Sequence, residues 1–289
     1  MNFLECRLRR LDVLPDNIDG FEKIDCSLNN LTKLPRGFTS LKVLNCSSNK
    51  LKEIPKGFTS LTVLNCSRNN LEKLPLDITD IREIDCSINK IIELPDSFIN
   101  LRVLICTENK LTELPRTIGN LKNLTNFDCG LNNIREIPDS IGNLEFLEIF
   151  RCYNNCLTKL PNLPGSLKEL DCSKNNLEFL PEILGKLRVL HCYNNKLTIL
   201  SNLPDTLEIL FCSNNMITSI SECKNLKTFH FANNKMKFIQ RMDRFNSIDY
   251  YGNPLIRPFG AEYSFFHDYY DYYVKIVKCI ITIQRKFKG

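Results

Sequence analysis

The sequence predicts a curved solenoid of the α/β class, in which every repeat adds one short strand to a parallel sheet. Two columns of residues and their spacing predict this fold. A cysteine recurs at intervals of about 20 residues, and an asparagine stands three residues after almost every one of them. A unit of this length cannot bury its apolar side alone, so the copies have to stack on one another.

The cysteine column marks eleven copies of the repeat, and two degenerate copies follow them. The marker residues are Cys6, Cys26, Cys46, Cys66, Cys86, Cys106, Cys129, Cys152, Cys172, Cys192 and Cys212, with Phe231 and Tyr250 in the same place of the last two copies. The asparagine column is Asn29, Asn49, Asn69, Asn89, Asn109, Asn132, Asn155, Asn175, Asn195, Asn215, Asn234 and Asn253. The marker step is 20 residues in most copies, 23 before Cys129 and Cys152, and 19 in the last two copies. Thirteen consecutive copies between Met1 and about Leu255 exclude a chance pattern.

Residues 41–55, LKVLNCSSNKLKEIP, show how one copy is expected to fold. Leu44 and Cys46 are two residues apart, which is the period of a strand with one buried face. Pro55 has no N–H group to donate and therefore ends regular pairing. An apolar residue in the next segment, Phe58 in this copy, is expected to close the outer side of the coil.

The asparagine column is interpreted as structural. Each asparagine stands where the chain leaves the strand, so the peptide groups around it lose their partners in the sheet. A carboxamide carries two donors and an acceptor, and a stack of them can satisfy peptide groups of adjacent copies.

The shared frame L-x-x-L-x-C-x-x-N-x-L resembles the frame L-x-x-L-x-L-x-x-N-x-L of the leucine-rich repeat family, with Cys in place of the third Leu. The resemblance implies a right-handed solenoid, or horseshoe, with a concave parallel sheet and a mostly irregular, extended or short-helical convex side. The 20-residue Cys-marked repeats are similar to those of giant-virus and protist proteins. Residues 115–133 and 138–155 look like repeats of Ras-binding and plant-type proteins, with room for a helical turn. Residues 160–181 and 200–220 carry a Pro in an N-L-P segment, Pro164 and Pro204, and are similar to repeats of secreted leucine-rich effectors of bacterial pathogens.

Residues 1–255 are predicted to form the solenoid and residues 256–289 a C-terminal capping helix, because the last copy of a solenoid needs a cover for its core. In an alternative interpretation, Ile283, Gln284, Lys288 and Gly289 resemble the opening I-Q-x-x-x-[RK]-G of a calmodulin-binding IQ motif, whose later basic residue is missing here. That alternative predicts a regulatory adaptor whose tail recruits a calmodulin-like partner.

Composition narrows the classes of function. The net charge is +5 from 38 basic and 33 acidic residues, which gives no reason to expect a nucleic-acid surface. Of the 14 cysteines, eleven stand in one inward column and are expected to be buried and reduced, since side chains in register point the same way rather than at each other. The start, MNFLECRLRR, has no apolar stretch after a basic leader, so we expect no secretory signal, and the longest apolar run, near 274–283, is too short to span a bilayer. We therefore expect a cytoplasmic, reducing location without membrane contact.

The sequence contains no arrangement that indicates catalysis, a cofactor or a metal. It has three histidines, no nucleophile turn of the G-x-S-x-G type, no glycine-rich phosphate loop and no C-x-x-C pair. His191 and His230 lie two copies apart without an obvious third ligand. The chain is therefore expected not to be an enzyme.

The residues that face outward from the strands are the expected binding residues, because the fold was not expected to need them. In the first copies these residues are small and polar, whereas five adjacent later copies present aromatic, apolar and charged side chains, which are enriched at interface centres. The candidate site residues are Ile149, Arg151, Tyr153, Asp171, Val189, His191, Tyr193, Ile209, Phe211 and His230. The sequence therefore predicts a non-catalytic scaffold that binds an unidentified protein partner on the concave sheet.

Overall fold

A computed structural model describes residues 2–15, 18, 20–36, 38–182, 185–239 and 245–255. The chain divides into two units, Met1–Pro254 and Leu255–Gly289. The predicted capping helix and the IQ-like residues lie outside the described residues.

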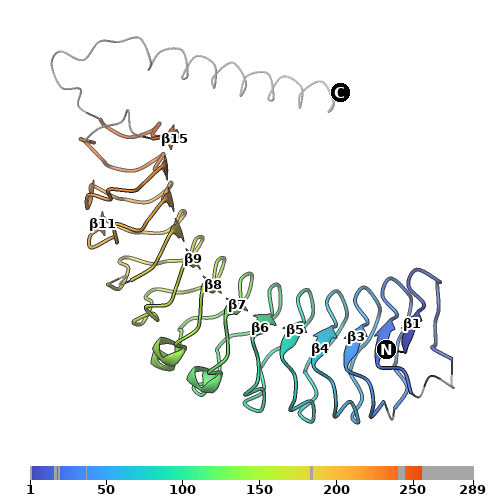
Figure 1. Cartoon of the computed structure of the whole chain (residues 1–289). Helices are drawn as coiled ribbons and strands as arrows, with labels where there is room; N and C mark the ends of the chain where they lie inside the picture. Colours follow the sequence, from blue (N-terminus) through green and yellow to red (C-terminus); the bar gives the residue numbers. More distant parts are fainter. Residues whose placement is uncertain are drawn as a thin grey trace, which may run out of the picture. The chain divides into compact units, whose positions relative to one another are not determined.

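The first unit is a solenoid built on one parallel sheet of thirteen strands, each from one copy of the repeat. The strands are β1 (Phe3–Glu5), β2 (Lys23–Asp25), β3 (Val43–Asn45), β4 (Val63–Asn65), β5 (Glu83–Asp85), β6 (Val103–Ile105), β7 (Asn126–Asp128), β8 (Ile149–Arg151), β9 (Glu169–Asp171), β10 (Val189–His191), β12 (Ile209–Phe211), β14 (Thr228–His230) and β15 (Ser247–Asp249). Within this unit the strands line the inner side of the curve (Figure 1). The predicted repeat solenoid with a concave parallel sheet is confirmed.

In the main sheet, each strand from β2 to β14 buries its middle residue and presents its two outer residues on the concave side. Leu44 of β3 pairs in register with Leu64 of β4, and Leu64 pairs with Ile84 of β5, so the apolar residues form a continuous column. The outer side of the coil is closed by a second apolar column, in which the rings of Phe38 and Phe58 stack with their centroids 5.4 Å apart. The core is therefore shared between neighbouring copies, as stacking requires.

The cysteine column points into this core, as predicted. The ladder cysteines from Cys26 to Cys212 are free thiols and at most 1% exposed. Burial raises the pKa of the Cys46 thiol to about 12 and that of Cys66 well above its ordinary value. These thiols therefore stay protonated and pack as small apolar groups.

The asparagine column is structural, and each member joins two copies. The Asn109 amide donates to the carbonyl oxygens of Cys86 and Cys106, both at 3.0 Å, and to that of Thr107 at 3.4 Å. Its side-chain oxygen accepts the backbone N–H of Ile91 at 3.0 Å. One carboxamide thus satisfies four peptide groups that have left the sheet.

The convex side is mostly irregular, with two kinds of exception. The two 23-residue copies contain the predicted helical turns, the 3-10 helices η1 (Ile118–Asn120) and η2 (Asp139–Asn143). Two short strands, β11 (Ile199–Leu200) and β13 (Ser219–Ile220), form a second parallel sheet that the sequence did not predict. None of the helices in the described part of the chain could span a membrane.

Candidate functional site

The structure brings the ten predicted site residues together on the concave side of β8 to β14. We call these ten residues the concave patch. All ten are partly exposed. Strand register explains the grouping, because Arg151, Asp171, His191, Phe211 and His230 are direct partners on successive strands. The end of each strand therefore contributes one member to a continuous row.

Ring contacts hold the centre of this row. The Phe211 ring makes edge contacts with both histidines, with centroid distances of 4.8 Å to His191 and 4.6 Å to His230. His230 Nε2 lies 2.9 Å from the Ser247 hydroxyl. His191 Nδ1 lies 3.7 Å from an Asp171 carboxylate oxygen. The rings therefore form a packed aromatic strip rather than isolated exposed groups.

The Phe211 ring lies between the His191 and His230 rings and contacts both. Within the described ranges, no group of three or more metal-ligating side chains was found.

Arg151 is held by a residue that sequence reasoning missed. Its guanidinium forms an ion pair with Glu169 of β9, with an Nη2 to Oε1 distance of 2.7 Å and an Nε to Oε1 distance of 2.9 Å. Register could have identified Glu169, because it stands beside Ile149 on the next strand. The pair fixes the Arg151 side chain at the border of the aromatic strip.

Tyr153 depends on the absence of a side chain at Gly130, which sequence reasoning also missed. A Cβ atom at Gly130 would collide with the Tyr153 ring, so the ring lies directly over this glycine. Burial, followed by the carboxylates of Asp128 and Asp171, raises the pKa of the Tyr153 hydroxyl. Tyr153 is therefore a neutral hydrogen-bonding group at neutral pH.

The expectation that the fold does not need the outward-facing residues is wrong for the second to fifth copies and for Asp171. In these copies an Asp or Asn ends the strand, and its Oδ1 accepts the backbone N–H and the hydroxyl of a Ser two residues later. We call this arrangement the capping pair. The pairs, with their hydroxyl to oxygen distances, are Asp25 and Ser27 (2.6 Å), Asn45 and Ser47 (2.8 Å), Asn65 and Ser67 (2.8 Å), Asp85 and Ser87 (2.6 Å), and Asp171 and Ser173 (2.6 Å).

Besides Tyr153, two ionisable groups of the concave patch have shifted pKa values. Burial would raise the pKa of Asp171, but hydrogen bonds from His191 and Ser173 outweigh it, and the pKa falls below its ordinary value. Burial lowers the pKa of His230, which Asp249 opposes only in part. The concave patch thus combines an ionised carboxylate, a neutral histidine and apolar rings at neutral pH.

Comparisons with known proteins agree with this geometry. A family model described as Leucine Rich Repeat matches residues 40–61 and 166–187. YopM, a leucine-rich effector protein from Yersinia pestis, is 31% identical with a TM-score of 0.75, over 87% of this chain and 78% of that chain. YopM from Yersinia enterocolitica is 27% identical with a TM-score of 0.73, over 89% of this chain, which spans only 61% of that chain.

A third structure shares the fold and one of its features. The functional domain of InlJ from Listeria monocytogenes, which includes a cysteine ladder, is 23% identical with a TM-score of 0.61, over 84% of this chain and 70% of that chain. No curated protein sequence matches the chain. The thirteen repeats, the parallel-sheet solenoid and the likeness to YopM from Yersinia pestis lead to one conclusion: the chain belongs to the leucine-rich repeat family.

Proposed function

We propose that this chain is a non-catalytic scaffold that binds a protein partner on the concave patch. Its leucine-rich repeat fold supports a role in protein interaction, because solenoids of this kind present extended concave binding surfaces. Fold alone does not assign function, so the argument rests on the residues of the concave patch.

The observation that carries the proposal is the absence of the capping pair from four of the five strands that carry the concave patch. Strands β8, β10, β12 and β14 end in Arg151, His191, Phe211 and His230, which replace the Asp or Asn of the capping pair. The turns that follow them keep their backbone bonds, as from Cys192 N–H to the Phe211 oxygen at 2.8 Å. The fold therefore does not require these side chains. Rings and a fixed guanidinium on a surface of this kind are typical of interface centres.

Site-specific photo-crosslinking tests the proposal. A benzophenone amino acid replaces Tyr193 in the concave patch, and in a matched variant it replaces Phe146, which is 60% exposed outside the patch. In cells that express the protein, we expect a discrete adduct with one protein from position 193 and none from position 146. Equal adducts from both positions, or none from position 193, would contradict the proposal.

A second variant separates binding from folding. Gly130→Ala adds one methyl group that displaces the Tyr153 ring and removes no residue of the concave patch. We expect the position-193 adduct to weaken while the melting temperature changes little. An unchanged adduct would show that Tyr153 does not belong to the binding surface.

The alternative adaptor role is tested in the full chain by Ile283→Glu with Gln284→Ala, which alters the IQ-like residues. We propose that the position-193 adduct persists in this variant and does not depend on calcium. If the adduct is lost, the tail rather than the concave patch recruits the partner.

We also propose a reducing compartment such as the cytoplasm. Twelve of the thirteen described cysteines are buried and Cys156 alone among them is exposed, so the fold uses thiols as core residues. With Cys279→Ser as background, a thiol reagent should modify Cys156 rapidly and the ladder cysteines only on unfolding. Rapid native-state modification of the ladder would overturn the assignment of the buried face.

A further inference from the structure

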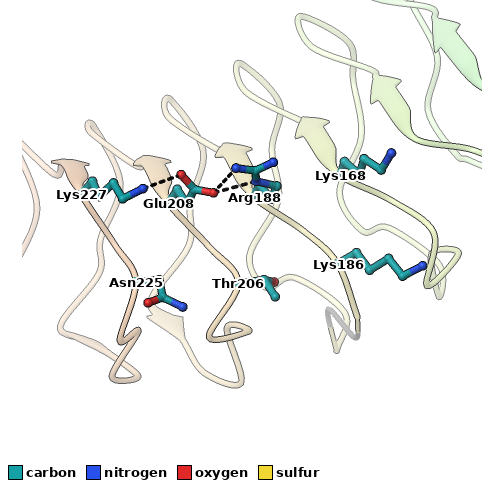
Figure 2. Close-up of a pocket in the computed structure, with 7 residues that line it drawn as sticks. All are labelled: Lys168, Lys186, Arg188, Thr206, Glu208, Asn225 and Lys227. Atoms are coloured by element: carbon teal, nitrogen blue, oxygen red, sulfur yellow. Dashed lines mark hydrogen bonds and ion pairs between the residues drawn. The ribbon is translucent and has the colours of Figure 1, made fainter.

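A shallow basic depression lies beside the concave patch and shares no residue with it. It has a volume of about 450 Å³, and its charged lining residues are Lys168, Lys186, Arg188, Glu208 and Lys227. We call it the basic depression. Four of these residues each directly precede a strand: Lys168, Arg188, Glu208 and Lys227. They therefore form a band along the edge of the sheet where the strands begin (Figure 2).

An internal ion-pair chain organises the band but leaves excess positive charge. Figure 2 shows Glu208 between Arg188 and Lys227: its Oε1 lies 2.6 Å from Arg188 Nε and its Oε2 lies 2.9 Å from Lys227 Nζ. Hydrogen bonds from Lys227 and then Arg188 lower the pKa of Glu208, so this carboxylate stays ionised. One carboxylate is therefore shared by two cations.

The remaining lysines raise the net charge further. Lys168 pairs with Glu148 at 2.6 Å, on the neighbouring turn, whereas Lys186 forms no ion pair with any described residue. The charged lining has a net charge of +3, or +2 when Glu148 is included. The whole chain carries only +5, so this depression concentrates a large share of it.

The neutral lining residues are already used by the fold. The Thr206 hydroxyl donates to the Leu187 carbonyl oxygen at 2.8 Å, and the Asn225 amide donates to the Asp205 carbonyl oxygen at 2.9 Å. The groups left for a ligand are therefore the cations, above all Lys186. Such a surface attracts a ligand with several negative charges but has no neutral polar side chain left to recognise a single polar group specifically.

We propose that the basic depression binds an acidic, carboxylate-rich peptide segment of a protein partner. The cations extend across four adjacent strands, β9 to β14, a span of about 14 Å at the usual strand spacing. An extended peptide of four or five residues has this length at about 3.3 Å per residue, whereas one phosphate group is too small to contact all of them. Lysine ammonium groups are point charges without a fixed fork, which suits carboxylates in varied positions. A net charge of +2 is too small for tracking a nucleic-acid backbone.

Fluorescence anisotropy of a labelled decaglutamate peptide with the full chain at low salt tests this proposal. We expect saturable binding that weakens as salt is added. Lys186→Glu should weaken binding at least about fivefold, because it replaces an attraction by a repulsion inside the basic depression. Lys196→Glu is the matched control: Lys196 is exposed on the opposite flank, and its reversal changes the net charge equally.

Equal weakening by the two variants would overturn the proposal, because binding would then follow net charge alone. Absence of saturable binding would overturn it as well, as would tighter binding of a single-stranded oligonucleotide of the same charge or full competition by inorganic phosphate at low concentration. Phe211→Ser provides the link to the concave patch. It should leave decaglutamate binding unchanged, so this proposal and the proposed partner site can fail independently.

Discussion

The early and late strands of the sheet make the same turn but hold it by different means. From β2 to β5 every strand ends in a capping pair, whereas among β8, β9, β10, β12 and β14 only β9 keeps one. The backbone bonds between turns and the asparagine column are the same in both regions. The capping pair is therefore an addition to a turn that forms without it. Where it is absent, the side chains at those positions require a reason other than folding.

The early and late copies also differ in the turn residue that has a left-handed backbone. In the early copies, β2 to β5, this place holds Leu28, Ser48, Arg68 and Ile88, with φ of 57°, 55°, 55° and 55°, although residues other than glycine and asparagine are unfavourable there. In the late copies it holds Asn154 and Asn194, with φ of 50° and 55°, and asparagine tolerates this conformation. The late copies thus combine better turn residues with the loss of the capping pair. In the late copies the asparagine in the turn favours the turn conformation, so the side chains on the concave surface are available for binding.

The largest expected effect comes from the asparagine column, which the two regions share. Asn109→Ala and Asn155→Ala should each lower the free energy of unfolding by about 1–3 kcal/mol, because each leaves buried peptide groups without partners. Both side chains are 8% exposed and make four hydrogen bonds, so the two losses should be equal within error. Urea denaturation measures them, with exposed Asn123→Ala as control, expected within about 0.5 kcal/mol of wild type. A loss of stability confined to Asn109→Ala would mean that other contacts stabilise the late turns.

A smaller effect, due to the capping pair, should differ between the two regions. Ser87→Ala removes the hydroxyl that donates to Asp85 at 2.6 Å and should cost about 0.5–1.5 kcal/mol. Ser213→Ala changes the equivalent residue after Phe211, where there is no capping pair, and should cost less than about 0.5 kcal/mol. Chemical denaturation of both variants gives the difference. Equal costs would show that the hydroxyl acts through the turn itself, and the argument from the missing capping pair would fail.

The repeat predicted more of the fold than of the site, for a physical reason. Stacking requires Leu44, Cys46 and Asn109 wherever the copies recur, so their roles can be derived from spacing alone. Register then places His191 beside Phe211, because each copy contributes one residue to every row. Gly130 and Tyr153 hold the same place of successive copies, and Glu169 lies diagonal to Arg151, so register gives their positions. Whether these side chains contact each other depends on residue identities that the repeat does not specify. The small sheet of β11 and β13 likewise results from where two convex segments meet rather than from a pattern in either.

A still smaller effect should come from exchanging the left-handed turn residues between the regions. Ile88→Asn should stabilise the protein by about 0.5 kcal/mol, because it relieves a β-branched side chain at φ of 55°. Asn194→Ile makes the reverse change at the same φ and should destabilise by a similar amount. Thermal unfolding of the two variants measures both shifts. Two shifts of the same sign would show that side-chain packing at these half-buried sites outweighs backbone preference.

The smallest effect is a pH dependence that belongs to the late copies. Burial holds the pKa of His230 below its ordinary value of 6.5, with Asp249 opposing the shift. Between the two pKa values the unfolded chain binds the proton that the folded chain excludes, so stability falls as the pH drops through 6.5 and levels off below the folded pKa. The difference between wild type and His230→Gln in urea denaturation across this range isolates the contribution. It should decrease toward acidic pH, because protonation places a charge against the Phe211 ring and the half-buried strip. A difference that increased instead would mean that Asp249 stabilises the protonated ring more than burial disfavours it, and the late concave surface would then gain stability on acidification.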